Sequence, residues 1–447
     1  MSYPRVLVVA MGRVNAADNA NNGLLLRNLF GDWPRESLAQ VYSGGDNGDE
    51  GFFGRYYELG PQERRLGRLF FRLKKEARGS ATTAGHERIG THVPVRWSAA
   101  LRSCGQRLLM DTGLYELLFR PRLSTSLGQW VDGFQPDIVL AQGYNLTFTW
   151  LPLMLADAFG LPIAYYPTDD WPSARYLDTK GFLGFARRSA RRAVETTSRQ
   201  LVGKAAVAIA FSPYMQEEYR QRYAKEFHVL MHGDDVGRFE AAGERRLAAS
   251  DECWIVTTGA FVQYRWPLLH DLDQACEVLG LRGLKVRVTV FPVSLPSGVA
   301  DPADEFRHIQ FEASPSHQGL AAMLRGADIL FLPERFDDTV DTIRLSVSSK
   351  AHLFMFSGRP IVVYSDPKAG ITRYAREEGW AAVVDHKDPL RLANTLEALL
   401  VNGGETLQLV ARARQVALRN HHLPTIQREF RSALISAIPE QGQHGHG

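Results

Sequence analysis

The sequence is poor in cysteine, with three in 447 residues: Cys104, Cys253 and Cys276. None of them forms a Cys-x-x-Cys pair, and their spacing does not match a structural zinc site. So few thiols fit a reducing compartment better than a disulfide-rich secreted protein. We interpret them as small buried hydrophobic side chains, and we predict neither a metal site nor a bound cofactor.

Long apolar runs and an excess of one charge are also missing. No stretch of about 18 uncharged apolar residues occurs, and the run Val6–Ala10 is much too short for a signal peptide. Lys and Arg number 52 against 49 Asp and Glu, and the net charge of +3 is too small to indicate nucleic-acid binding. We expect a cytoplasmic protein that does not span a membrane, with the inner face of the membrane as an alternative location.

What the sequence does contain is a repeated alternation of short apolar runs with helical stretches. The first half predicts strands at 6–11, 38–42, 136–141, 162–166, 206–210 and 227–231, with helices near 23–30, 151–159, 184–203 and 213–223. Continuous apolar strands that alternate with helices indicate a parallel sheet covered on both faces. Residues 61–128 are less regular and partly basic.

The second half repeats the same alternation after a polar stretch at 237–251, which we interpret as a linker. It predicts strands at 254–259, 285–291, 309–311, 329–332, 360–364 and 381–384, and helices near 266–280, 316–325, 346–357, 370–378 and 388–401. A long helix over 405–436 is expected to kink or break at Pro424. The predicted fold class is α/β, with domains at 1–236 and 252–420, a helix at 421–437 that returns to the first domain, and a disordered tail at 438–447.

Several motifs occur in a recognisable order. The second half contains Ala327–Pro333, then Ser349 and Lys350, then Gly358-Arg359-Pro360 and Gly370, and the first half contains Pro136–Leu140, Phe211–Met215 and His232–Asp235. This order resembles the GT-B glycosyltransferases that use nucleotide-diphosphate sugars, in the large bacterial class called glycosyltransferase group 1. The resemblance covers roughly 130–400 well, and it implies two Rossmann-like domains that face each other across a cleft.

The resemblance has one departure. Many relatives carry two glutamates flanking the helix before the Gly-x-Pro turn, but the second position is Leu353 here, five residues before Gly358. The first glutamate is replaced by Glu334 or by Asp337-Asp338, and relatives without the pair often have a lysine where Lys350 stands. The departure leaves the sugar contacts and the stereochemical outcome open. It also keeps a second hypothesis open, a catalytically inactive GT-B scaffold or partner-binding subunit.

Candidate donor-binding residues follow from the charge that grows on a departing nucleoside diphosphate. Without a metal, backbone N–H groups at a helix start and Lys or Arg side chains must balance that charge. The candidates are Gly259, Arg265, Glu334, Arg344, Ser348, Ser349 and Lys350. The alternative interpretation is a tight strand-to-helix turn at Gly259, a solvated helix start at Ser348–Lys350 and surface arginines. The expected donor is a UDP, GDP or dTDP sugar.

Candidate catalytic and acceptor-binding residues lie in the first half. Asp169 and Asp170 follow an apolar strand, where open α/β sheets bind ligands, and either can act as a general base for an acceptor hydroxyl. Acceptor contacts are predicted for Gly12, Asn22, Gly23, Tyr144 and Trp171, with Trp171 stacking on a sugar or forming the cleft wall. The alternative is an N-capping aspartate beside a packed tryptophan.

Two basic runs interrupt the first half, at 64–75 and at Arg187–Arg192. A basic helix with interleaved apolar residues can lie on an anionic membrane, near a lipid-linked acceptor, although a solvated basic helix is at least as good an interpretation. The leading hypothesis is sugar transfer to a glycan or lipid-linked acceptor in surface polysaccharide or glycoconjugate synthesis. A phosphorylase or epimerase of the same fold ranks lower, and the absence of Gly-x-Gly-x-x-Gly after a strand disfavours a dehydrogenase.

Overall fold

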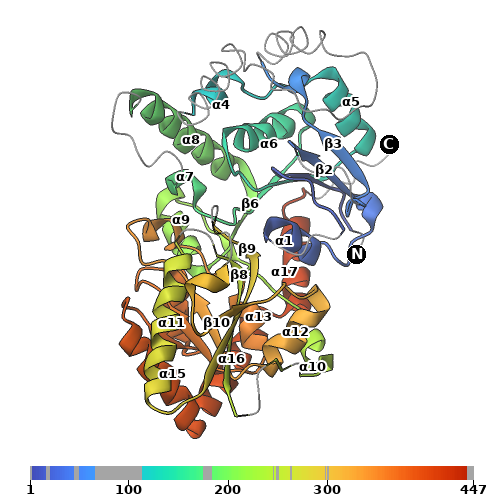
Figure 1. Ribbon diagram of the computed structural model, residues 1–447. Helices are drawn as coiled ribbons and strands as arrows, with labels where there is room; N and C mark the ends of the chain where they lie inside the picture. Colours follow the sequence, from blue (N-terminus) through green and yellow to red (C-terminus); the bar gives the residue numbers. More distant parts are fainter. Residues whose placement is uncertain are drawn as a thin grey trace, which may run out of the picture.

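The computed structural model describes residues 3–16, 21–44, 50–65, 113–174, 184–244, 246–247, 251–261, 264–296, 299 and 302–439. It contains two parallel sheets, each with helices on both faces, and Figure 1 draws one above the other. The first sheet has the strand order β3-β2-β1-β4-β5-β6-β7, and the second has β10-β9-β8-β11-β12-β13. In both, the order reverses next to the first strand, which is the arrangement of a Rossmann fold.

The N-terminal domain is the part built on the seven-stranded sheet. Its strands are β1 (Val6–Val9), β2 (Leu38–Tyr42), β3 (Arg55–Glu58), β4 (Ile138–Ala141), β5 (Ile163–Tyr165), β6 (Ala205–Ala210) and β7 (His228–Val229). Its helices are α1 (Asn21–Leu29), α4 (Leu114–Leu118), α5 (Thr125–Phe134), α6 (Leu146–Phe159), α7 (Trp171–Ala174), α8 (Gly184–Lys204), α9 (Pro213–Tyr223) and α10 (Val236–Ala241), with short 3₁₀ helices at Arg35–Ser37 and Pro61–Glu63.

The C-terminal domain is the part built on the six-stranded sheet. Its strands are β8 (Cys253–Ala260), β9 (Val286–Ser294), β10 (Ile309–Phe311), β11 (Ile329–Pro333), β12 (Ile361–Tyr364) and β13 (Ala382–Val384). Its helices are α11 (Trp266–Leu281), α12 (His317–Gly326), α13 (Ala351–Phe356), α14 (Gly370–Glu378), α15 (Pro389–Val401) and α16 (Gly403–Asn420), with 3₁₀ turns η3 (Pro302–Glu305) and η4 (Val340–Ile343).

The strands of both sheets are buried because their side chains are apolar on both faces. Every residue of β1, β4, β11 and β12 is buried. Removing this apolar surface from water stabilises each sheet by about 25 cal/mol per Å². The predicted strands are confirmed with shifts of a few residues at their ends, whereas β3 was missed. The predicted helix at 346–357 is wrong at its start, because α13 begins only at Ala351.

The long C-terminal helix is broken near Pro424, which confirms the break and not the kink. α16 ends at Asn420, and α17 (Leu423–Ser436) begins after two intervening residues with Pro424 in its first turn. Proline is tolerated there because no intrahelical partner is needed for the missing N–H, so Pro424 starts a helix rather than kinking one. Residues 440–447 of the predicted tail lie outside the described part of the chain.

The last helix packs against the N-terminal domain. In Figure 1, α17 (red) lies beside α1 (blue), and the Phe430 ring meets the Phe30 ring edge-on with centroids 5.2 Å apart. Gln427 donates a hydrogen bond to the carbonyl of Asn28 at 2.6 Å, and Arg431 forms an ion pair with Asp32 at 3.0 Å. The chain therefore crosses between the domains twice, through α10 and the residues after it and again before α17.

Candidate active site at the domain junction

The carboxyl ends of the two sheets meet at the domain junction. By this term we mean residues 168–174 and α9 of the N-terminal domain, together with residues 337–350 of the C-terminal domain. The Ser346 hydroxyl donates to Asp169 at 3.1 Å, Arg344 pairs with Glu218 at 3.0 Å, and the Ser212 hydroxyl donates to the carbonyl of Leu345. All candidate donor residues lie on or beside the C-terminal half of this junction.

Arg265 and Glu334 form a buried ion pair at the carboxyl ends of β8 and β11. Two guanidinium nitrogens of Arg265 donate to the Glu334 carboxylate, with the shortest contact at 2.6 Å, and the third donates to the carbonyl of Ala260 at 3.0 Å. Burial raises the pKa of Glu334, but Arg265, Lys350 and the Ser348 hydroxyl outweigh it and hold that pKa below its ordinary value. Arg265 is thus engaged on all three nitrogens, and Ser348 is engaged by Glu334.

Lys350 lies beside this pair and against the turn that follows β8. Gly259 has φ +126°, and a Cβ there would come within 3.0 Å of the Lys350 Nζ, so only glycine leaves room for the ammonium. Within the described residues, Nζ has no hydrogen-bond acceptor or ion-pair partner. Burial, with a smaller contribution from Arg265, lowers the pKa of Lys350 to about 8. Two cations against one carboxylate leave a net positive charge, which suits an anionic ligand.

The remaining donor candidates are less available than Lys350 to bind a diphosphate. Ser349 is exposed in a turn, and Arg344 pairs with Glu218 across the domain junction. Ser348 and Ser349 lie near the start of a helix, as predicted, but outside it, since both precede Lys350, which is the N-cap of the six-residue α13. Leu353 of α13 is buried. Asp337 accepts from the N–H of Thr339 in its own loop, so Glu334 is the acidic residue that lies with Lys350 and Arg265.

The two adjacent aspartates of the N-terminal domain have different environments. Asp170 is 3% exposed, and Arg222 and Tyr219 hold its carboxylate at 2.7 to 3.0 Å. Asp169 is exposed and accepts one hydrogen bond, from Ser346. Although part of its surface is open to solvent, desolvation by the protein atoms packed around the carboxylate raises the pKa of Asp169, Ser346 lowers it, and Asp170 raises it further. We therefore retain Asp169 and withdraw Asp170 as a catalytic candidate, because Asp170 is already bound by the protein.

The acceptor candidates divide in a similar way. Trp171 is a correction: it is buried in a cluster with Leu146 and Val194, so its ring is not available to stack on a sugar. Tyr144 is partly exposed, and its hydroxyl is 2.9 Å from that of Thr168, which joins the loops after β4 and β5. Asn22 exchanges two amide hydrogen bonds with the buried Gln142 at 2.7 and 2.5 Å.

The two glycines near the first strand leave space at the same end of the sheet. Gly12 is exposed, and a Cβ there would meet no atom within 4 Å. Gly23 is partly exposed in the first turn of α1. The chain's own packing does not require glycine at position 12, so close approach of a ligand remains the reason we predict for Gly12.

Sequence reasoning missed the residues that bring the two halves together. Ser346, Glu218, Arg222 and Tyr219 were not among the candidates, and Ser346 and Asp169 are 177 residues apart in the chain. The signal that existed was the spacing of Tyr214, Glu218 and Arg222 at i, i+4 and i+8, which places them on one face of a helix.

Comparisons with known proteins agree with this geometry. Residues 77–233 match the family model described as a glycosyl transferase 4-like domain. HepE from Anabaena, solved with UDP and glucose, superposes over 97% of this chain and 100% of its own with TM-score 0.58 at 14% identity. The chain has the GT-B glycosyltransferase fold. At this identity the likeness concerns the fold alone, and no curated protein matches the chain.

Two further GT-B structures superpose as completely. WaaG, a glycosyltransferase involved in lipopolysaccharide biosynthesis, covers 97% of this chain and 99% of its own with TM-score 0.56 at 12% identity. Sucrose-phosphate synthase from Thermosynechococcus elongatus covers 96% and 98% with TM-score 0.58 at 11% identity. The domain match and the GT-B fold together support a glycosyltransferase.

Two negative findings apply to the described residues. In that part of the chain, no group of three or more His, Cys, Asp and Glu side chains is arranged to hold a metal ion. Across the same residues, every helix is too short or too polar to cross a bilayer.

Proposed function

We propose that the protein transfers a sugar from a nucleotide-diphosphate sugar to a hydroxyl of a glycan or lipid-linked acceptor. The observation that carries this proposal is the Lys350 ammonium, which lies against Gly259 with no partner among the described residues and next to a fully engaged Arg265–Glu334 pair. In the proposal Lys350 binds the diphosphate, Arg265 holds Glu334 and adds positive charge, and Asp169 accepts the proton of the acceptor hydroxyl.

One short stretch of chain connects the two proposed groups, Lys350 and Asp169. Ser346 contacts Asp169, and Ser348 contacts the Glu334 carboxylate beside Lys350. Residues two apart have Cα atoms at most about 7 Å apart, so both contacts come from one short stretch of chain. A donor bound by its diphosphate at Lys350 would therefore present its anomeric carbon near Asp169, which supports acid–base chemistry at that carboxylate.

The nucleotide is the next question, and UDP is the first to test. HepE was solved with UDP and glucose, and a trehalose-phosphate synthase from Burkholderia vietnamiensis with TM-score 0.56 is described as UDP-forming. A thermal-shift series with UDP, GDP, dTDP, CMP and ADP should raise the melting temperature with one nucleoside diphosphate. At about 100 times Kd the stabilisation is about 2.7 kcal/mol. Unchanged melting with every nucleotide would contradict the donor site.

The inactive-scaffold hypothesis has a specific observation in its favour. Leu353, at the position of a family glutamate, is buried and apolar. A scaffold would bind a nucleotide at Lys350 without releasing nucleoside diphosphate from any nucleotide sugar, even with acceptor present. Release of nucleoside diphosphate by the wild-type protein, abolished by changes at Asp169, separates the enzyme from the scaffold.

A membrane-facing surface of the N-terminal domain is part of the proposal. α8 exposes Phe185, Arg188 and Arg192 at i, i+3 and i+7, and Phe185 is 75% exposed. Leu118 of α4, which packs against α8, is also exposed. Of the other basic run, residues 66–75 lie outside the described residues. We propose that this face of α8 contacts anionic lipid headgroups, with the aromatic ring in the interface.

Vesicle flotation tests that contact. The wild-type protein should float with phosphatidylglycerol vesicles and not with phosphatidylcholine vesicles. Arg188→Glu with Arg192→Glu should weaken binding by at least about thirtyfold, at about 1 kcal/mol for each arginine removed. The control is Arg307→Glu with Arg391→Glu, an equal change of charge at two exposed arginines of the C-terminal domain. Equal flotation of the double variant and the control would contradict a role for α8.

A further inference from the structure

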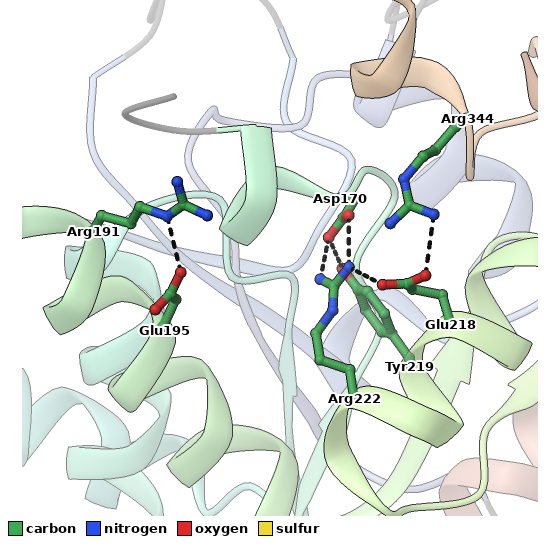
Figure 2. Close-up of polar contacts among 7 residues, drawn as sticks. All are labelled: Asp170, Arg191, Glu195, Glu218, Tyr219, Arg222 and Arg344. Carbon is green, nitrogen blue, oxygen red and sulfur yellow. Dashed lines mark hydrogen bonds and ion pairs between the residues drawn. The ribbon is translucent and has the colours of Figure 1, made fainter. Parts of the chain in front are cut away.

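One face of α9 connects the two domains. Tyr214, Glu218 and Arg222 lie one helical turn apart, and each bonds outside the helix. The Tyr214 hydroxyl donates to Glu377 at 2.7 Å, and Glu218 accepts from Arg344 at 3.0 Å, so two of the three reach the C-terminal domain. Figure 2 shows Glu218 between Arg222 on its own helix and Arg344 on the opposite domain.

The same helix fixes the loop that carries Asp169. Arg222 holds both oxygens of Asp170, at 2.7 and 3.0 Å, and the Tyr219 hydroxyl adds a third bond at 2.9 Å. A planar guanidinium that binds a carboxylate with two parallel bonds fixes direction as well as distance. Since Asp169 precedes Asp170, its backbone is fixed by this pair, while its side chain reaches across to Ser346.

The opposite side of these contacts is a single short segment of the C-terminal domain, residues 344–350. Arg344 binds Glu218, Ser346 binds Asp169, Ser348 binds the Glu334 carboxylate, and Lys350 lies against Gly259. Residues 344–346 touch the N-terminal domain, and Ser348 and Lys350 at the proposed diphosphate site follow them within four residues of the same segment. A ligand that fixes Lys350 must restrict the positions available to Ser346 and Arg344.

We propose that Arg222 and Glu218 are positioning residues, and that they couple occupancy of the diphosphate site to the placement of Asp169. Arg222 holds the Asp169–Asp170 loop, Glu218 bridges Arg222 to Arg344, and the 344–350 segment transmits donor binding to this network. This inference deepens the proposed function and rests on it. It implies an order of events: the donor binds first, and the Asp169 carboxylate reaches its catalytic position afterwards.

The charge state of Glu218 is suited to this role. Arg344 and Arg222 outweigh the effect of burial and hold the pKa of Glu218 at about 2, so the bridge stays ionised throughout the neutral range. The carboxylate side chain is 31% exposed, and that of Arg344 is 35% exposed. Removing either partner therefore leaves the other in contact with water, and the variants are expected to fold. Changing Arg222 would instead leave the buried Asp170 without its cation, so we do not use it as the first test.

The test uses Glu218→Gln and Arg344→Gln, with Glu217→Gln as the matched control. Glu217 is the neighbouring residue on α9, and among the described residues its carboxylate accepts hydrogen bonds only from Arg220 and Gln221 of the same helix. Amide hydrogen exchange is measured with and without UDP, or with the nucleoside diphosphate that stabilises the protein. We expect the nucleotide to slow exchange in residues 168–174 about tenfold in the wild type and in Glu217→Gln, but less than twofold in Glu218→Gln and Arg344→Gln.

A kinetic measurement accompanies it. In Glu218→Gln, the kcat for nucleoside diphosphate release should fall about tenfold, while the nucleotide Kd changes less than twofold. Adding Arg344→Gln should lower kcat little further, because the effects of coupled residues are not additive. Wild-type kcat in Glu218→Gln, or nucleotide protection of residues 168–174 that survives it, would overturn the coupling. A role in stability alone would lower the melting temperature and leave both readouts unchanged. A wild-type protein that binds no nucleotide would instead refute the proposed function.

Discussion

Replacing Asp169 by asparagine should lower turnover by about 10²- to 10⁴-fold, the usual contribution of a positioned general base. Asparagine keeps the size of the side chain and can still meet the Ser346 hydroxyl, but it cannot accept a proton. Nucleotide affinity should change less than twofold, because within the described residues the hydrogen bond of Asp169 to the C-terminal domain is the one from Ser346, which lies outside the proposed diphosphate site. Nucleoside diphosphate release gives the turnover, and calorimetry gives the affinity.

The pH profile sharpens this prediction. A general base works only when it is deprotonated, so the rate should rise with pH through the pKa of Asp169. That pKa is raised chiefly by loss of solvation, so the rise should lie above the ordinary range of an aspartate. Asp169→Asn should abolish the acidic limb, whereas Asp157→Asn, at an exposed aspartate of α6 paired with Lys204, should keep both rate and profile. Full turnover in Asp169→Asn would end its catalytic role.

The predictable parts of the fold are the elements whose residues share one environment, so that burial gives a regular apolar pattern in the sequence. Strands such as β1 and β11 are buried on both faces, so an apolar run predicts them directly. β3 was missed because it is an edge strand with exposed Arg55 and Glu58 at its ends, and it pairs only with β2. A partly exposed edge strand lacks the apolar pattern on which the prediction depends.

Candidates for the proposed site could be named one at a time from the sequence, but their pairing could not. Local rules for a glycine after a strand and a carboxylate at a strand's carboxyl end suggested Gly259 and Asp169, and a helix start together with the family resemblance suggested Lys350. Which of two adjacent aspartates stays available depended on Arg222, 52 residues away in the chain, and on the burial of Trp171. Such pairings arise only when elements far apart in the sequence pack together within the N-terminal domain, and nothing local in the sequence contains them.

Replacing Lys350 by alanine should weaken nucleoside diphosphate binding by about 10- to 100-fold, the value of a hydrogen bond to a charged group at 1.5 to 3 kcal/mol. The fold should persist, because Glu334 keeps its buried pair with Arg265. The matched control is Lys285→Ala, where an exposed lysine pairs with Asp251 at the amino end of β9. It should bind nucleotide as the wild type does. Calorimetry measures the affinity, and the melting temperature checks the fold.

The pH dependence of binding identifies the ammonium itself. The diphosphate binds the protonated lysine, so binding must raise a pKa that is about 8 in the free protein. Affinity should be constant below that pH and should fall by up to about tenfold for each unit above it, since one proton is taken up on binding. The nucleotide contributes no slope there, because a phosphate loses its second proton near pH ~6. Lys350→Ala should bind weakly and without this slope. If nucleotide affinity depended on pH equally in the wild type and in Lys350→Ala, another cation would bind the diphosphate. Arg344 would then be the candidate, because it lies at the other end of the 344–350 segment.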